Sequence, residues 1–176
     1  MKLIDIEIAM ADYLMPANVV VTNVSWGFGL HECDLLSVSG SRYLTETEIK
    51  ISKSDLLKDA NKRHGHVSDK IKYLYFAVPD YLRDIALAHI PERSGLMTVS
   101  EKGKPCLVKG KLAKSETKIV KVVKKPTANP NAKPLTDKEL LNLYRLGCLK
   151  YWTVKRNLGK EKQKEILLLT TQNTQL

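Results

Sequence analysis

The feature that most constrains the fold is the stretch 30–62, which contains two β-strand patterns and a helix pattern. The strand patterns, Glu32–Val38 and Tyr43–Ile51, are separated by a short Gly-Ser-Arg turn. Ser52 and Asp55 have the spacing of a helix capping box, and apolar residues follow at helical spacing. The stretch therefore predicts a β-hairpin followed directly by a capped helix.

The hairpin carries two acids whose relative position depends on the register. Alternation along the strand puts Asp34 on the same face as Leu36 and Val38. Pairing of Val38 with Leu44 would then put Asp34 directly opposite Glu48, about 4.5–5.5 Å away at Cβ. A slip by one residue would send Glu48 to the other face. In this register, two carboxylates and the lysine two residues after Glu48 would meet on one face of the sheet.

Two carboxylates this close repel each other unless a positive charge lies between them. Mg²⁺ or Mn²⁺ would fit, because such hard cations take oxygen ligands, and the backbone carbonyl of Ile49 could be a third ligand. Lys50 could orient or deprotonate the attacking water, or neutralise charge on a phosphate. These groups together predict a site for phosphodiester hydrolysis. The alternative is that Glu46, Glu48 and Lys50 form an ordinary solvated sheet face with cross-strand ion pairs.

The pattern of Asp34, then Glu48-Ile49-Lys50, then a basic helix resembles the PD-(D/E)xK nuclease superfamily. It is most similar to the MmcB-like bacterial DNA-repair endonucleases, over roughly residues 27–113. The resemblance implies an α/β fold with a restriction-endonuclease-like αβββαβ core, in which helices flank a central mixed sheet. It also implies a Mg²⁺- or Mn²⁺-dependent nuclease that hydrolyses DNA in repair, and leaves endonuclease and exonuclease action both open.

The resemblance also implies roles for individual residues. Asp34, Glu48 and Lys50 would be catalytic. The metal ligands would be Asp34, Glu48 and the backbone carbonyl of Ile49, joined by Glu7 from an N-terminal helix; a solvated or capping role is the alternative for Glu7. Cys33 stands where the superfamily has the proline of its name. The basic residues on the helix after the hairpin would hold the DNA backbone, or form an ordinary solvated face: Lys53, Lys58, Lys62 and Arg63.

The charge balance favours a polyanionic partner. Lysine and arginine number 29 against 19 acids, which gives a net charge of +10 and a pI of about 9.5. DNA is the expected partner. No apolar run approaches the roughly 20 residues of a membrane helix, and Asp5 and Glu7 exclude a signal peptide at the start. The three cysteines are far apart and predict no disulfide framework, which is typical of a reducing cytoplasm.

The rest of the chain predicts further elements around the hairpin. They are an N-terminal helix over 2–15, strands at Asn18–Ser25, Ile71–Val78, Gly95–Val99 and Pro105–Lys109, and a short helix at Tyr81–His89. A turn is expected at Glu101–Lys104, and the lysine-dense segment from Lys109 to Lys125 is assigned no element. Ile71–Val78 lacks polar alternation and predicts a central strand buried on both faces.

The chain is expected to divide into a nuclease-like domain over 1–125, a proline- and asparagine-rich linker over 126–134, and a helical, basic C-terminal extension over 135–176. Thr136 and Glu139 have the spacing of a helix cap. The extension could pack on the core, bind nucleic acid, or hold a partner, either a second copy in a homodimer or a repair protein. The alternative to the nuclease is a non-catalytic nucleic-acid-binding module or a partner-binding protein that retains the nuclease fold.

Overall fold

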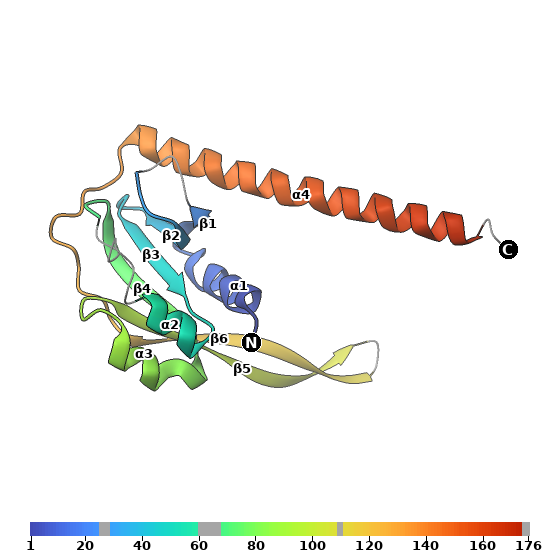
Figure 1. Cartoon of the computed structure of the whole chain (residues 1–176), viewed down its shortest axis with the longest axis horizontal. Coiled ribbons are helices and arrows are strands. Elements are labelled where there is room, and N and C mark those ends of the chain that lie inside the picture. The colour runs from blue at the N-terminus through green and yellow to red at the C-terminus, as the bar shows by residue number, and fades with distance from the viewer. Residues whose placement is uncertain (25–28, 60–67, 109–110, 174–176) are drawn as a thin grey trace.

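The computed structural model describes residues 1–24, 29–59, 68–108 and 111–173. At 59, 103–108, 111–117 and 166–173 it describes the backbone alone. The fold is α/β: helices flank a six-stranded mixed sheet with the strand order β1-β2-β3-β4-β5-β6 (Figure 1). The elements in chain order are α1 (Leu3–Leu14), β1 (Asn18–Val24), β2 (Cys33–Ser39), β3 (Leu44–Ile49), α2 (Lys53–Asp59), β4 (Ile71–Pro79), the 3-10 helix η1 (Asp80–Leu82), α3 (Arg83–His89), β5 (Gly95–Val108), β6 (Lys111–Lys124) and α4 (Asp137–Asn173).

The predicted hairpin is formed by β2 and β3, in the predicted register. The two strands are antiparallel and pair Val38 with Leu44. The turn closes with a hydrogen bond from the Ser39 N–H to the Tyr43 carbonyl, at 3.2 Å. Arg42 takes the left-handed conformation in this turn, with φ of 67°. The register on which the site depends is therefore confirmed.

The helix after the hairpin reverses the chain so that β4 runs parallel to β3. Its cap is formed by Ser52, whose Oγ accepts a hydrogen bond from the Asp55 N–H at 3.2 Å. β4 lies inside the sheet between β3 and β5, and its side chains enter the cores on both faces: Leu74 and Phe76 pack on one side, and Ala77 on the other. The predicted central strand is confirmed.

The C-terminal half of the sheet differs from the prediction. Instead of two short strands joined by a turn at Glu101–Lys104, β5 is one long strand, and the lysine-dense segment forms its partner β6. β5 pairs with β4 only over Gly95–Val99, so beyond that point β5 and β6 form a two-stranded ribbon that extends from the body (Figure 1). Both faces of such a ribbon can meet solvent, which removes the apolar alternation that identifies a strand. The predicted turn is wrong for this reason.

The two faces of the sheet are covered by different helices. On one face, Ile6 and Met10 of α1 pack against Leu35 and Ile49. On the other face, α2 and α3 contribute to a cluster around Phe76 over β4 and β5. That face is also covered at its β1–β2 side, where the first turns of α4 bring in two leucines. Glu46 and Glu48 of β3 lie between these two covered regions, because Glu46 pairs with Leu36 and Leu74, and Glu48 pairs with Phe76.

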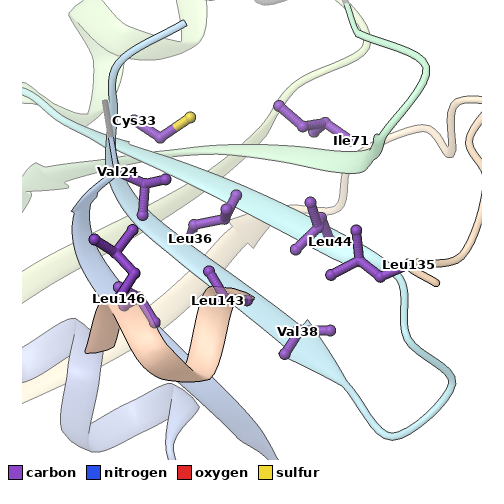
Figure 2. Close-up of a cluster of buried hydrophobic side chains, with 10 residues drawn as sticks. Val24, Cys33, Leu36, Val38, Leu44, Ile71, Leu135, Leu143 and Leu146 are labelled. Atoms are coloured by element: carbon purple, nitrogen blue, oxygen red, sulfur yellow. The ribbon is translucent and has the colours of Figure 1, made fainter. Parts of the chain in front are cut away.

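The last helix begins on the body and continues beyond it. Leu143 and Leu146 pack against Val24, Leu36 and other apolar side chains of β1, β2 and β3 (Figure 2). The side chains over 151–165 are all exposed, and this part of α4 extends away from the sheet (Figure 1). Among the described residues, no helix is both long and apolar enough to span a membrane.

The start of α4 is fixed by its cap and by the segment before it. Thr136 and Glu139 form the predicted capping box: the Thr136 N–H donates to Glu139 Oε2 at 2.9 Å, and the Glu139 N–H donates to Thr136 Oγ1 at 3.3 Å. Lys70 adds an ion pair to Glu139 Oε1 at 2.7 Å. Residues 126–134 contain no helix or strand, and the Asn129 N–H donates to the Lys72 carbonyl at 2.8 Å.

Candidate metal and phosphodiester site

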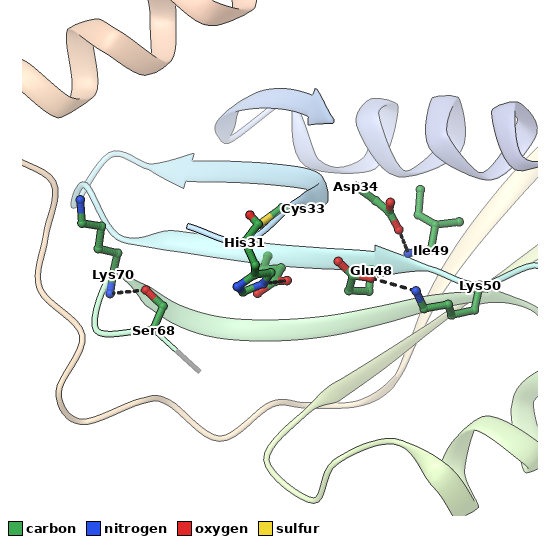
Figure 3. Close-up of polar contacts among 9 residues, drawn as sticks. His31, Cys33, Asp34, Glu48, Ile49, Lys50, Ser68 and Lys70 are labelled. Carbon is green, nitrogen blue, oxygen red and sulfur yellow. Dashed lines mark hydrogen bonds and ion pairs between the residues drawn. The ribbon is translucent and has the colours of Figure 1, made fainter. Parts of the chain in front are cut away.

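Glu48 and Lys50 meet at the carboxyl end of β3. Lys50 Nζ lies 2.9 Å from Glu48 Oε2 (Figure 3), as expected for side chains two residues apart on one face of a strand. The backbone continues in the sheet at this point, because the Lys50 N–H donates to the Ala77 carbonyl of β4 at 3.0 Å. The predicted proximity of Glu48 and Lys50 is therefore present in the structure.

Asp34 approaches the same stretch of β3 from β2, but from the side opposite to Glu48 (Figure 3). Its Oδ2 accepts a hydrogen bond from the Ile49 N–H at 2.8 Å (Figure 3). The carboxylate therefore lies against the peptide between Glu48 and Lys50, where it takes a backbone donor of β3. In Figure 3 the Asp34 and Glu48 carboxylates lie on either side of this stretch of β3. Two acids and one amine thus gather around Ile49.

The reason for this difference is an interruption of the side-chain alternation along β2. The β1–β2 register is unshifted from Thr22 with Leu35 to Val24 with Cys33, and Leu35 packs in the cluster of α1 and Ile49. Cys33 packs in the same cluster as Leu36, so the alternation is interrupted at Asp34. The predicted shared face of Asp34 and Leu36 is therefore wrong, and so is the predicted meeting of the Asp34 and Glu48 carboxylates on one face of the sheet (Figure 3).

The polar face of β3 is buried rather than solvated. Relative exposure is 0 % for Glu46, 1 % for Glu48 and 5 % for Lys50, whereas Asp34 is half-buried. The interpretation of these residues as an ordinary solvated sheet face is therefore wrong. Burying an ionised group costs several kcal/mol unless it is paired or bound to a metal. The chain retains three such groups side by side on one strand, which marks this region as a candidate functional site.

A second polar cluster, which the sequence did not indicate, includes Glu46, two residues before Glu48 on β3. His31 Nε2 is 2.5 Å from Glu46 Oε1, and the Cys33 thiol lies beside them (Figure 3). Burial raises the pKa of the Cys33 thiol, and the nearby Glu46 and Glu48 carboxylates raise it further. The alternation that puts Glu46 and Glu48 on one face was the available signal, but His31 precedes the strand and has no spacing that points to it.

The remaining predicted site residues lie around this region. Glu7 is half-buried on α1, and its role as a metal ligand stays a prediction. Lys53 and Lys58 are exposed on α2, which begins three residues after Lys50. Their role in holding DNA stays a prediction as well. The other two predicted DNA-binding residues, Lys62 and Arg63, lie outside the described residues.

Comparison with known proteins gives a likeness in fold alone. No model of a protein family matches the chain, and no curated protein matches it. The chain is similar in structure to the SPO1766 protein of unknown function from Silicibacter pomeroyi, with a TM-score of 0.59. The similarity covers 92 % of this chain and 94 % of that one, at 15 % sequence identity. The two chains therefore share an overall fold over nearly their whole length.

Proposed function

We propose that this protein is a metal-dependent nuclease that hydrolyses DNA phosphodiester bonds, with a role in DNA repair. One observation carries the proposal: the carboxylates of Asp34 and Glu48 and the amine of Lys50 gather around the Ile49 peptide. This is the set of groups, on the same two strands, that the resemblance to PD-(D/E)xK nucleases requires. The element order from α1 through β3 and α2 to β4 is also the αβββαβ order of that fold.

The donor set fits a hard divalent cation. Asp34, Glu48 and the carbonyl of Ile49 offer only oxygen, which Mg²⁺ and Mn²⁺ prefer. When bound, the cation would polarise the scissile phosphate and activate the attacking water. Lys50 would donate a hydrogen bond to that water or to a phosphate oxygen, as its ammonium now does to Glu48. The hydrogen bond from Ile49 holds Asp34 in a fixed orientation before substrate arrives.

The charge of the protein supports a nucleic-acid substrate. The chain has a net charge of +10, and Lys53 and Lys58 are exposed on the helix that follows the site. Lysines suit the sequence-independent attraction of phosphates, which is what a non-specific nuclease needs. The exposed basic part of α4 adds to the same field and extends it beyond the body.

A nicking assay on supercoiled plasmid tests the proposal. Purified protein should nick the plasmid in Mg²⁺ or Mn²⁺ and not in EDTA. Asp34→Asn and Glu48→Gln should each lower the rate at least about 100-fold. Asp34→Asn keeps an oxygen that can accept the Ile49 N–H, so its loss of activity should come without loss of folding. Asp84→Asn, an exposed acid on α3, is the matched control and should cleave normally.

The contrary results are equally specific. Nicking that continues in EDTA, or that survives both Asp34→Asn and Glu48→Gln, would exclude this site as the source of the activity. Each variant is first checked by thermal unfolding, and only variants with a cooperative transition are compared. An inactive wild-type protein in both metals, on plasmid and on single-stranded oligonucleotide, would also contradict the proposal.

The second candidate is a non-catalytic nucleic-acid-binding module with the same fold. It is favoured by the near-complete burial of Glu48 and Lys50, which are already paired with each other. In that case the protein should bind DNA with a steep dependence on salt, and the binding should survive Asp34→Asn and Glu48→Gln. Measured binding with no cleavage in any metal would favour this candidate over the nuclease.

A further inference from the structure

His31, Cys33 and Glu46 form a polar cluster next to the proposed nuclease site. Glu46 belongs to the middle of β3, Cys33 begins β2, and His31 lies in the segment that leads into β2. A carboxylate oxygen, an imidazole nitrogen and a thiol sulfur here lie within 4.8 Å of one another. Cys33 and Glu46 are both 0 % exposed, and the His31 side chain is 10 % exposed.

The donor set differs in kind from that of the nuclease site. Mg²⁺ and Mn²⁺ prefer oxygen ligands, whereas a site with one imidazole and one thiolate suits a softer ion, above all Zn²⁺. Catalytic zinc sites use three protein ligands and leave a fourth position for water or substrate. We propose that His31, Cys33 and Glu46 bind one Zn²⁺ ion, with solvent at the fourth position.

The distances are compatible with this ion after a small adjustment. Ligand atoms around a tetrahedral zinc lie roughly 3.3–3.8 Å apart, for bonds of about 2.0–2.3 Å. The three donor atoms already lie within 4.8 Å of one another, and the His31–Glu46 contact of 2.5 Å would open by about one ångström. His31 is the most exposed of the three ligands and lies in the segment ahead of β2. Rotation of its imidazole therefore supplies the adjustment and opens the site toward solvent.

The charges balance as well. Neutral imidazole, thiolate and carboxylate together carry two negative charges, which Zn²⁺ neutralises. Binding breaks the S–H bond of Cys33 and forms a Zn–S bond, and the proton released goes to solvent. The ion would remove the cost of keeping the Glu46 carboxylate buried.

The position of the site indicates what the ion would do. It would join the segment ahead of β2 to the middle of β3, immediately beside Asp34, and so hold in place the start of β2, from which Asp34 reaches Ile49. Glu46 and Glu48 are two residues apart on one strand, about 7 Å, so the zinc site and the hard-cation site can be filled separately. The zinc proposal therefore stands whether or not the protein is a nuclease.

The test uses the full chain, stripped with a chelator and kept reduced. Titration with Zn²⁺ should show one tightly bound ion per chain. Co²⁺ in its place should give the near-ultraviolet absorption of a cobalt–thiolate bond. Cys33→Ser should abolish that absorption, and Cys33→Ser and His31→Gln should each weaken Zn²⁺ binding at least about tenfold. The matched control is Cys106→Ser/Cys148→Ser, which leaves Cys33 as the only thiol and should behave like the wild type.

A measurement on the wild-type protein guards against variants that fail to fold. X-ray absorption at the zinc edge should find one sulfur and three nitrogen or oxygen ligands. Absence of stoichiometric Zn²⁺ binding, a zinc shell without sulfur, or binding that Cys33→Ser and His31→Gln leave unchanged would each overturn the proposal. If zinc binds as expected but plasmid is never nicked, the zinc site stands and the proposed nuclease function fails.

Discussion

Lys50 Nζ lies 2.9 Å from Glu48 Oε2 in a place where both side chains are almost fully buried. Removing one partner of a buried ion pair leaves an uncompensated charge, which costs about 3–5 kcal/mol. We therefore expect Lys50→Met to lower the free energy of unfolding by about 3 kcal/mol in chemical denaturation. The double variant Glu48→Gln/Lys50→Met, which has no charge left at the pair, should recover part of that loss. Lys138→Met, an exposed lysine at the start of α4, should change stability by less than about 0.5 kcal/mol. A loss below about 1 kcal/mol in Lys50→Met would contradict the observed pairing.

Gly95 should tolerate no side chain. Gly95 is the first residue of β5. A Cβ atom there would lie 2.4 Å from Tyr75 Cε1 and 2.9 Å from the carbonyl oxygen of Lys124. Overpacking of this kind costs about 1–3 kcal/mol, so Gly95→Ala should lower the midpoint of urea unfolding accordingly. Gly40→Ala is the control, because nothing lies within 4 Å of its Cβ position. Equal midpoints for the two variants would show that β4 and β5 are spaced differently from the structure described.

The ion pair between Lys70 and Glu139 should make the stability of the fold depend on pH. The hydrogen bond from Lys70, together with those from Thr136, lowers the pKa of Glu139 to about 2 from its usual 4.5. A lowered pKa in the folded state means that the contribution is present above about pH 4.5 and is lost as the pH falls toward 2.

The stability difference between wild type and Glu139→Gln should therefore be largest near neutral pH, at about 1 kcal/mol. It should shrink as the pH falls below 4.5 and be lost as the pH falls through about 2. Thermal unfolding across this range measures it, with the exposed Glu161→Gln as the control. A difference that stays constant from pH 6 to pH 2 would mean that the Glu139 carboxylate is not held in the cap.

The exposed part of α4 should contribute to binding of DNA through its charge. Its lysines point into solvent beyond the body, and Lys155 lies over the rings of Tyr151 and Trp152, 5.8 and 5.1 Å from their centroids. Each lysine that contacts a phosphate adds about 0.9 to the slope of log affinity against log salt.

We expect replacement of four lysines of this segment by glutamine to weaken binding to duplex DNA. The slope of log affinity against log salt should become shallower by up to about 0.9 for each of the four lysines. The four are Lys155, Lys160, Lys162 and Lys164. Fluorescence anisotropy over a salt series measures both quantities. The control is Lys133→Gln/Lys138→Gln, near the body. If the variant with all four replacements and the wild type showed the same slope of log affinity against log salt, the segment would not be a DNA-binding surface.

The sequence predicted the part of the fold whose signals are local. The hairpin register followed from Val38 and Leu44, the helix caps from Ser52 and Thr136, and the central strand from an unbroken apolar run. It did not predict the long β5–β6 ribbon, because that pairing depends on backbone hydrogen bonds rather than on apolar alternation. Without apolar alternation, the lysine-dense segment looks the same in sequence as a loop.

The candidate site was predictable in part for a related reason. Glu48 and Lys50 are two residues apart on one strand, so their contact follows from alternation alone. Asp34 does not share a face with Glu48 as predicted, because Cys33 packs with Leu36 and the alternation along β2 is interrupted at Asp34 (Figure 3). The contact of His31 with Glu46 joins residues 15 apart, one of which is outside any regular element, and no periodicity encodes it.

The central claim is that Asp34, Glu48 and the Ile49 carbonyl can hold one hard cation beside Lys50. A crystal of the protein soaked in Mn²⁺ and measured for anomalous scattering tests it most directly. The account predicts a single manganese peak coordinated by those three oxygens, with Lys50 Nζ released from Glu48 and turned toward the ligand sphere. A soaked crystal in which the Glu48–Lys50 pair stays intact and no manganese lies between Asp34 and Glu48 would contradict it.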